Sequence, residues 1–249
     1  MLRWIQNLGH LIYKGWFYLV TAIPVFVCSP LLVIGILSER TYPVLYWVAR
    51  SIWAPFILFM MGTPVRKVDG SKALPAPPFI VVANHTSMLD IMLLLRICKK
   101  PIVFVGKEEL ARIWFFGFFY KRAAVLVNRS DKNSRKRVYE RVREKLKYNR
   151  SIAIYPEGGV PHVSVDMDRF KDGAFSMAIE HELPLVPIVN FDCKKRLNWE
   201  LFEGGPGILR YTILETIPAN SYNLEELEGF KHHVRNTMLE VLREDQASC

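Results

Sequence analysis

The N-terminal part of the chain contains a long uncharged stretch, and this stretch limits the possible folds more than any other feature. No charged residue lies between Gly15 and Ser38, and the segment Trp16–Leu37 is almost wholly apolar. As a helix, such a run can cross the roughly 30 Å hydrocarbon core of a bilayer. It is too long for the apolar part of a signal peptide, and no small-residue cleavage site follows it. We therefore predict a membrane segment, bent at Pro24 and Pro30.

A second apolar run, Pro43–Gly62, follows the short polar connection Glu39-Arg40. It contains Arg50 and Pro55, so it would span a bilayer poorly unless the Arg50 side chain reached a lipid headgroup. Two membrane arrangements remain open: a hairpin with both ends in the cytoplasm, and a pair of helices partly sunk in one leaflet. The alternative is a buried helical hairpin in the core of a soluble protein, although the first run is longer than ordinary core helices.

Basic residues flank this pair of runs on both sides, whereas the connection between them is close to neutral. They are Arg3 and Lys14 before the pair and Arg66 and Lys67 after it. Basic residues beside membrane segments mark the cytoplasmic side. We predict membrane-associating helices over residues 1–65, an α/β domain over residues 66–249, and a location at the cytoplasmic face of the inner (plasma) membrane.

Short β-rich apolar runs alternate with helical patterns after the proline-rich link 74–78. The predicted strands cover 79–82, 102–105, 124–127, 152–155 and 185–189, with an edge strand over 211–217. The predicted helices cover 88–98, 133–148, 170–182 and 224–242. This alternation predicts an α/β fold with a mostly parallel central sheet flanked by helices. Ligands of such sheets bind at the carboxyl ends of the strands.

Composition narrows the class of protein further. A chain of 249 residues that is 51% hydrophobic has enough apolar side chains for one main core, so a disordered protein is excluded. The balance of 33 Lys+Arg against 24 Asp+Glu gives a net charge of +9, which indicates anionic partners. The four cysteines lie far apart without metal-ligand spacing, so we expect neither a disulfide framework nor a zinc site.

The first predicted strand of the α/β domain runs directly into the segment Asn84–Asp90. Residues five apart on a helix diverge by about 140°, so His85 and Asp90 meet only if His85 lies on the turn before the helix. Asp90 can then accept a hydrogen bond from one imidazole nitrogen and leave the other as a general base. The alternative is a structural histidine. Ser87 is a conceivable nucleophile, but it is too close in sequence to His85 to use that base well.

These residues resemble the hallmark of the glycerol-3-phosphate and 1-acylglycerol-3-phosphate acyltransferases, which is Asn-His, four residues, then Asp. Asn84, His85 and Asp90 match it. Further blocks of the family resemble, in the same order, Lys107–Leu110 with Val127–Arg129, then Tyr155–Gly158 with Phe170–Gly173, and then Val186–Ile188. The matches cover residues 84–188, which is nearly all of the α/β body.

The resemblance implies an acyltransferase of phospholipid biosynthesis. A fatty acyl group would move from a thioester of acyl-carrier protein or coenzyme A to the free hydroxyl of 1-acylglycerol-3-phosphate, giving phosphatidic acid. His85 and Asp90 would be catalytic, and the implied substrate-binding residues are Asn84, Lys107, Arg129, Glu157, Gly158 and Lys171. We expect no metal and no cofactor, since the thioester is a co-substrate, and we expect backbone N–H groups near the His85 turn to stabilise the oxyanion. The alternatives are another lysolipid or aminolipid acceptor, and a non-catalytic basic module that binds an anionic ligand at the membrane.

Phosphate binding is expected where the strands end. The guanidinium of Arg129 suits a phosphate, whereas the carboxylate of Glu157 would repel one. We therefore assign Glu157 to the glycerol hydroxyl or to holding Arg129. The family usually has Thr-Arg or Ser-Arg after Glu-Gly, but Gly159 and Val160 stand here, so Lys171 or Arg169 is expected to substitute.

Two further segments have more than one interpretation. Between Arg129 and Arg150 ten Lys/Arg face three acidic residues on an amphipathic helical pattern. Such a helix can be a solvated face, or it can attract anionic lipid or an acidic acyl-carrier protein; no nucleic-acid recognition motif is found, and we expect no nucleic-acid partner. The aromatic cluster Trp114–Tyr120 is interpreted as core packing in preference to a channel for an acyl chain.

Overall fold

The computed structural model of the protein describes residues 2–128 and 132–248. Within these residues, one sheet has seven strands in the order β1-β7-β6-β2-β5-β3-β4. The strands are β1 (Val65–Lys67), β2 (Ile80–Ala83), β3 (Ile102–Lys107), β4 (Ala124–Val127), β5 (Ser151–Ile154), β6 (Leu185–Asn190) and β7 (Leu209–Ile213). Only the pairing of β6 with β7 is antiparallel, so β7 and β1 run opposite to the other five. The predicted α/β fold with a mostly parallel sheet is confirmed.

Ten α-helices surround the sheet in the part of the chain that the structure describes. They are α1 (Leu2–Val27), α2 (Ser29–Ile36), α3 (Tyr42–Val48), α4 (Ala54–Met60), α5 (Leu89–Ile97), α6 (Phe116–Ala123), α7 (Lys132–Leu146), α8 (Gly173–Glu180), α9 (Cys193–Arg196) and α10 (Leu227–Ala247). A π-helical turn η1 (Ala49–Trp53) joins α3 to α4, and η2 (Glu108–Arg112), η3 (Ala219–Ser221) and η4 (Leu224–Glu226) are short 3₁₀ turns.

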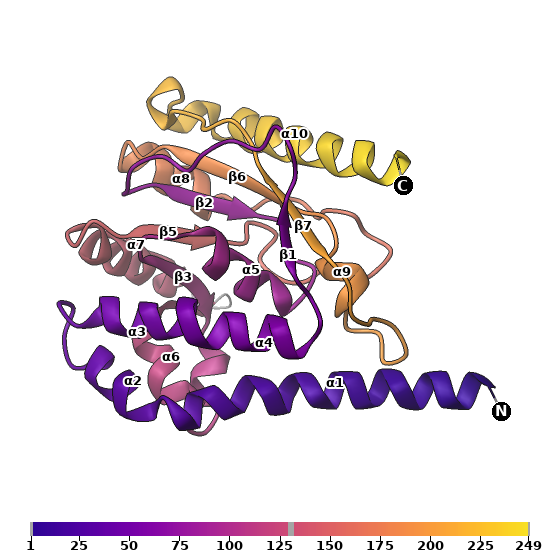
Figure 1. The fold of residues 1–249 in the computed structure, drawn as a ribbon. Coiled ribbons are helices and arrows are strands. Elements are labelled where there is room, and N and C mark those ends of the chain that lie inside the picture. The colour runs from indigo at the N-terminus through magenta and orange to yellow at the C-terminus, as the bar shows by residue number, and fades with distance from the viewer. Residues whose placement is uncertain (1, 129–131, 249) are drawn as a thin grey trace.

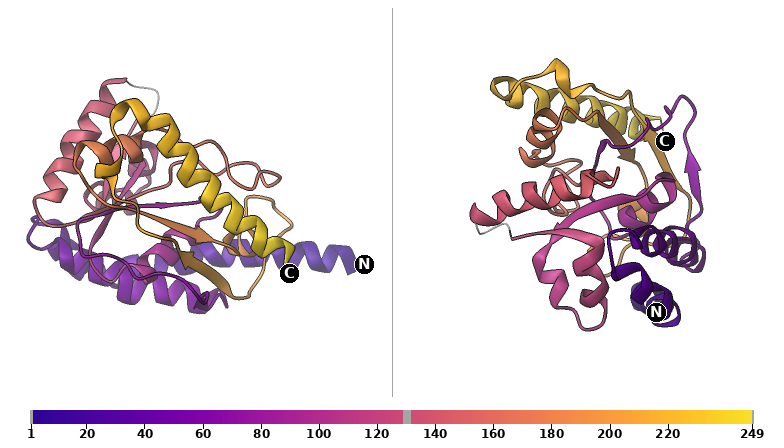
Figure 2. Two further views of the ribbon diagram at one scale, coloured as in Figure 1. Left: turned by 90° about the horizontal axis from the view of Figure 1, so that it is seen from above. Right: turned by 90° about the vertical axis from the view of Figure 1, so that its left-hand side faces the viewer.

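The helices form two layers, one on each face of the sheet (Figure 1). One layer holds α8 and α10, and the other holds α5 with the continuous α3–η1–α4 rod packed on it. Helix α1 is the outermost element of this second layer, and its N-terminal part projects beyond the rest of the molecule (Figure 2). Strands β2 and β6 lie in the middle of the sheet and are wholly buried, because both layers cover them.

The two apolar runs are the helix α1 with α2 and the rod α3–η1–α4. The structure has two helical segments long and apolar enough to cross a membrane, Arg3–Val27 and Tyr42–Met60, within the residues described. Bends were expected at Pro24 and Pro30; the structure has one break at Cys28, two residues before Pro30, and Pro24 lies inside α1. The first run is only partly buried, and large apolar side chains along α1 are exposed: Trp4, Ile5, Leu8, Leu11, Ile12, Tyr18, Leu19, Phe26 and Val27. These exposed side chains oppose the alternative of a hairpin in a soluble core.

Arg50, in the second apolar run, contacts the α/β body. Its Nε donates a hydrogen bond to the backbone oxygen of Cys98, 3.2 Å away at the end of α5. The hydroxyl of Tyr46 donates to the same oxygen at 2.8 Å. The polar groups of this rod are thus satisfied by the α/β body, so the rod packs on the body and not in lipid alone.

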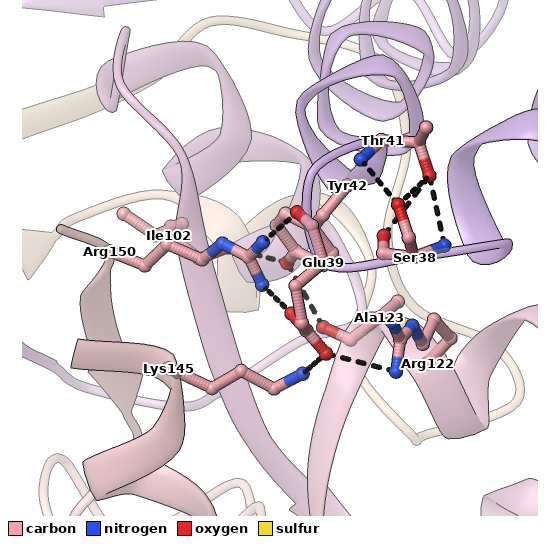
Figure 3. A network of polar contacts seen from close by, with 9 residues as sticks. All are labelled: Ser38, Glu39, Thr41, Tyr42, Ile102, Arg122, Ala123, Lys145 and Arg150. Carbon is pink, nitrogen blue, oxygen red and sulfur yellow. Dashed lines mark hydrogen bonds and ion pairs between the residues drawn. The ribbon is translucent and has the colours of Figure 1, made fainter. Parts of the chain in front are cut away.

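The connection between α2 and α3 is fixed to the α/β body by a cluster of charges (Figure 3). The Glu39 carboxylate binds Arg122 at 2.9 Å, Lys145 at 2.8 Å and Arg150. Arg150 also donates to the Glu39 backbone oxygen, and its guanidinium lies over the ring of Tyr42, 3.9 Å from the centroid. Hydrogen bonds and neighbouring cations keep the pKa of Glu39 below its usual range, against the effect of burial. A carboxylate shared by three cations is a stable junction between distant parts of the chain.

The aromatic cluster 114–120 divides between core and surface. Phe119 is buried, and Phe115 stacks on Phe26 of α1 with 4.4 Å between the ring centroids. Trp114 and Phe118, in contrast, are exposed by 84% and 60%. The prediction of core packing is therefore confirmed for Phe115 and Phe119 and wrong for Trp114 and Phe118.

Candidate active site

The candidate active site lies at the carboxyl ends of β2, β5 and β6, where the sequence predicts a ligand. Strand β2 ends at Ala83, and α5 begins at Leu89, so His85 lies on the turn between them. Its Nδ1 is 3.0 Å from Oδ2 of Asp90 in the first turn of α5. The predicted contact is confirmed. Because Asp90 accepts the Nδ1 proton, Nε2 is the ring atom that can take a proton from another group.

Asp90 is fully buried and is held by the same turn that carries His85. The backbone N–H groups of Thr86 and Ser87 donate to Asp90 Oδ2 at 2.7 and 2.8 Å. Negative charge is also favoured at this position by the N-terminus of α5. A buried carboxylate can remain charged with these donors, which is what a partner of an imidazolium needs.

Asn190, at the end of β6, is a site residue that sequence reasoning missed. Its Nδ2 donates to Asp90 Oδ1 at 3.3 Å, and its backbone N–H donates to Asn84 Oδ1 at 2.8 Å. Asn84 Nδ2 in turn donates to the backbone oxygen of Asn190 at 2.9 Å. Asn84 is therefore buried and ties the ends of β2 and β6 together, while the substrate-binding role implied for it stays a prediction. A polar residue that ends a wholly buried strand was the available signal.

Tyr155 forms one wall of the site. Its ring stacks on the His85 imidazole, with 4.1 Å between the centroids and 18° between the planes. Burial raises the pKa of the Tyr155 hydroxyl well above its usual value, so the phenol is neutral. The stacked ring restricts the orientation of the imidazole, a function that the motif alone did not indicate.

Glu157 supports the His85 turn from the neighbouring strand end. Its Oε1 accepts the backbone N–H of His85 at 2.8 Å, and its Oε2 accepts the backbone N–H of Asp168 at 2.8 Å. Burial raises the pKa of Glu157 to about 7, although the two amide donors act in the opposite direction. Its implied contact with substrate stays a prediction, whereas its contact with the catalytic turn is observed.

These contacts correct one expectation about the oxyanion. The N–H groups of His85, Thr86 and Ser87 already donate to Glu157 and Asp90. They cannot also stabilise an oxyanion, so that expectation is wrong for these three amides. The alternative nucleophile is disfavoured as well, because Ser87 Oγ is buried and donates its proton to the Leu197 backbone oxygen.

Basic residues predicted for phosphate lie around this edge. Gly158 has a φ of +76°, and a side chain there would meet Lys171 at 2.9 Å, so the lysine lies directly over the glycine. Lys107 ends β3 at the same edge of the sheet and is exposed. Arg129 lies outside the residues that the structure describes. The roles of all three basic residues stay predictions.

A cavity of about 350 Å³ adjoins the His85 turn. Its lining is formed by Thr86, the segment 160–163 after β5, Lys194 and the segment 198–200. Val160, which stands where the family usually has an arginine, contributes to it. Thr86 is the residue of the His85 turn that lines this cavity, whose size suits part of a substrate. Residues 2–128 and 132–248 hold no group of three or more histidines, cysteines or carboxylates placed for a metal.

An α/β sheet that presents a carboxylate-bound histidine beside a cavity at its carboxyl edge defines a class of enzyme that activates a hydroxyl by general-base catalysis. The family model "Acyltransferase" matches residues 65–190, which is half of the chain and includes every strand of the sheet except β7. The chain belongs to this acyltransferase family.

Individual relatives agree with this assignment. The chain is 30% identical over 203 residues to the 1-acyl-sn-glycerol-3-phosphate acyltransferase of Saccharomyces cerevisiae, covering 80% of this chain and 66% of that protein. It is 25% identical to the human 1-acyl-sn-glycerol-3-phosphate acyltransferase beta over 94% of this chain and 84% of that one. Its fold matches the crystal structure of the 1-acyl-sn-glycerophosphate acyltransferase of Thermotoga maritima, with a TM-score of 0.78, 22% identity and 98% of each chain covered.

Proposed function

We propose that the protein transfers a fatty acyl group from a thioester to the free hydroxyl of 1-acylglycerol-3-phosphate, which gives phosphatidic acid. The observation that carries this proposal is the 3.0 Å contact between His85 Nδ1 and Asp90 inside the segment that matches the acyltransferase family. The names of the relatives supply the acceptor, since both the yeast and the human proteins are 1-acylglycerol-3-phosphate acyltransferases.

The reaction follows from the position of the imidazole. His85 Nε2 takes the proton of the acceptor hydroxyl while the oxygen attacks the thioester carbonyl carbon. The tetrahedral intermediate then expels the thiolate as the C–S bond breaks, and the imidazolium returns the proton to the sulfur. Asp90 stabilises the imidazolium between these steps, so the scheme needs neither a metal nor an acyl-enzyme. General-base catalysis of this kind contributes about 10²- to 10⁴-fold in rate.

Phosphate recognition is assigned to basic residues at the same edge of the sheet. Lys171 lies over Gly158, and we assign it, with Arg129 and Lys107, to the acceptor phosphate. Glu157 keeps the His85 turn in place through the backbone, which leaves phosphate contact to the cations. This division agrees with the chemistry of each group, because a carboxylate repels a phosphate.

The membrane helices are assigned to one leaflet at the cytoplasmic face of the inner membrane. A spanning hairpin would place Glu39 about 30 Å from the membrane surface that carries the α/β body. Glu39 instead binds Arg122, Lys145 and Arg150 of that body. The connection between the helices therefore lies on the same side as the active site, which favours the arrangement with helices sunk in one leaflet. We assign Arg141 and Arg143, which are exposed on α7, to attracting an acidic acyl-carrier protein, and coenzyme A is the alternative donor.

The experiment is acyl transfer to lysophosphatidic acid in liposomes by the wild type and by His85→Ala. We expect the variant to lose activity by at least about 10²-fold. His233→Ala is a matched control, since this histidine is exposed on α10. A panel of lysolipid and aminolipid acceptors, each with acyl-carrier protein and coenzyme A thioesters, identifies acceptor and donor. Acyl transfer by His85→Ala at the wild-type rate would refute general-base catalysis by His85, and absence of transfer by both proteins would favour a non-catalytic anionic-ligand binder.

A further inference from the structure

The loop between α9 and β7 exposes a group of large apolar side chains. Trp199, Leu201 and Phe202 are exposed by 57%, 59% and 48%. Figure 1 shows this loop, in orange, extending from the sheet toward α1. Single exposed apolar residues are ordinary, but a contiguous group marks a surface that contacts a partner or a membrane.

The loop is held next to the membrane helix. Lys14 Nζ of α1 donates to the backbone oxygen of Asn198 at 2.7 Å. On the other side, the backbone N–H of Gly207 donates to the oxygen of Gly62, just beyond α4, at 2.9 Å. The loop therefore contacts α1 at Lys14, and the residues just before this lysine in α1 include the exposed apolar side chains of Leu11 and Ile12.

The loop is also ordered before any partner arrives. Asn198 Nδ2 donates to Glu203 Oε2 at 2.7 Å, and Asn198 Oδ1 accepts the Glu200 backbone N–H at 2.9 Å. The backbone N–H of Gly205 donates to the Arg196 oxygen at 2.9 Å, which closes the base of the loop. A loop with its own hydrogen bonds presents its apolar residues at a small cost in conformational entropy.

The same loop forms part of the cavity beside the candidate active site. Asn198, Trp199 and Glu200 line this cavity, and Thr86, the residue after His85, lines it as well. Trp199 is thus both exposed at the surface and part of the wall of the cavity that adjoins the His85 turn. Just before the loop, Lys195 is exposed and adds positive charge, which suits anionic headgroups.

We propose that residues 198–205 dock into the lipid leaflet that holds α1 and form the lip over which a single-chain lipid passes from the bilayer to the cavity beside His85. The occupant of this surface is the bilayer itself, because the loop is hydrogen-bonded to α1, a helix that is long and apolar enough to lie in a membrane and exposes large apolar side chains. The docking is independent of the chemistry, whereas the identity of the lipid that passes rests on the proposed function.

A fluorescence experiment tests the docking without any activity. The wild type and Trp199→Phe are bound to vesicles of phosphatidylethanolamine and phosphatidylglycerol, and the difference between their emission spectra isolates Trp199. We expect this difference to be quenched by brominated acyl chains and protected from aqueous iodide. Quenching by iodide with none by brominated lipid would overturn the proposal.

An activity experiment tests the passage of lipid. The double variant Leu201→Ser, Phe202→Ser is compared with Leu224→Ser, a matched control that is 54% exposed in η4, before α10 on the opposite face of the sheet. For long-chain lysophosphatidic acid held in vesicles, we expect the double variant to lose on the order of tenfold in kcat/KM. For a short-chain acceptor that is monomeric in water, it should stay within about twofold of the wild type, as should the control with both acceptors.

The two experiments separate the failure of this inference from the failure of the proposed function. Lipid quenching of Trp199 in a protein that transfers no acyl group would leave the docking intact and refute the reaction. Equal losses with vesicle-held and water-soluble acceptors would show that the loop acts on the catalytic site alone, and the proposed lip would be refuted.

Discussion

Replacing Asp90 by asparagine should separate the catalytic charge of this residue from its structural contacts. An asparagine has nearly the same volume, and its side-chain oxygen can still accept the N–H groups of Thr86 and Ser87, which lie 2.7 and 2.8 Å from Oδ2 in the wild type. The variant loses the negative charge beside the imidazole, and its amide NH2 group replaces the Oδ1 acceptor of Asn190 Nδ2. Asp90→Ala, in contrast, leaves both buried amides without their acceptor.

The magnitude follows from the distance. Two unit charges about 3 Å apart interact by about 5 kcal/mol at an effective dielectric constant of about 20. The imidazolium charge is spread over the ring and part of this energy is already present before the transition state, so we expect kcat to fall by about 10³-fold in Asp90→Asn. Each orphaned amide costs about 1–3 kcal/mol, so Asp90→Ala should lose about 2–6 kcal/mol of unfolding free energy.

Steady-state acyl transfer in liposomes measures the first effect, and thermal denaturation in detergent measures the second. The expected pattern is an asparagine variant that is folded but nearly inactive, beside an alanine variant that is both inactive and unstable. A kcat of Asp90→Asn within about tenfold of the wild type would refute general-base catalysis by a carboxylate-supported His85.

Three other predictions concern the surroundings of the site and the membrane helices. Burial raises the folded-state pKa of Glu157 from 4.5 to about 7, so the folded protein binds more protons than the unfolded chain between these pH values. The free energy of unfolding should therefore fall by up to about 3 kcal/mol as the pH rises through this window. Thermal melts of Glu157→Gln should lack this pH dependence. Membrane-impermeant maleimide should label Arg40→Cys and Glu244→Cys, over the background of the unmodified chain, from the same side of sealed vesicles; labelling from opposite sides would restore the spanning hairpin. Gly158→Ala should destabilise the fold by about 1–3 kcal/mol, because alanine disfavours a φ of +76°. It should also raise KM for the lysolipid, because the added methyl group displaces Lys171. An unchanged KM would show that this turn does not hold the lysine for substrate.

The α/β body was predictable from sequence because its central strands are short, wholly apolar runs bounded by polar turns. The edge of the sheet was harder to predict from the sequence. Strand β1 has three residues, two of them exposed and charged, and only its pairing with β7 makes it a strand. Helix α1 begins at Leu2 and includes Lys14, whereas the hydrophobic pattern predicts a start after this charged residue. The helix can include the lysine because its Nζ donates to the backbone oxygen of Asn198, which lies 184 residues away in sequence.

The same contrast between local and distant contacts applies to the site. His85 and Asp90 were predictable as a pair because one turn carries both. Asn190 meets Asp90 across 100 residues of sequence, and Glu157 meets the His85 amide across 72. No local pattern encodes such meetings, which depend on the order of the strands in the sheet. The division of the chain at residue 65 stays a prediction.

The junction at Glu39 has a consequence for biosynthesis. Its cationic partners Lys145 and Arg150 follow it by 106 and 111 residues. The ribosome therefore synthesises both apolar helical segments well before the two cations that bind Glu39. Closing so long a stretch of chain is slow compared with forming a helix. We therefore expect the N-terminal helices of the nascent chain to enter lipid, or to bind a chaperone, before their contacts with Lys145 and Arg150 can form.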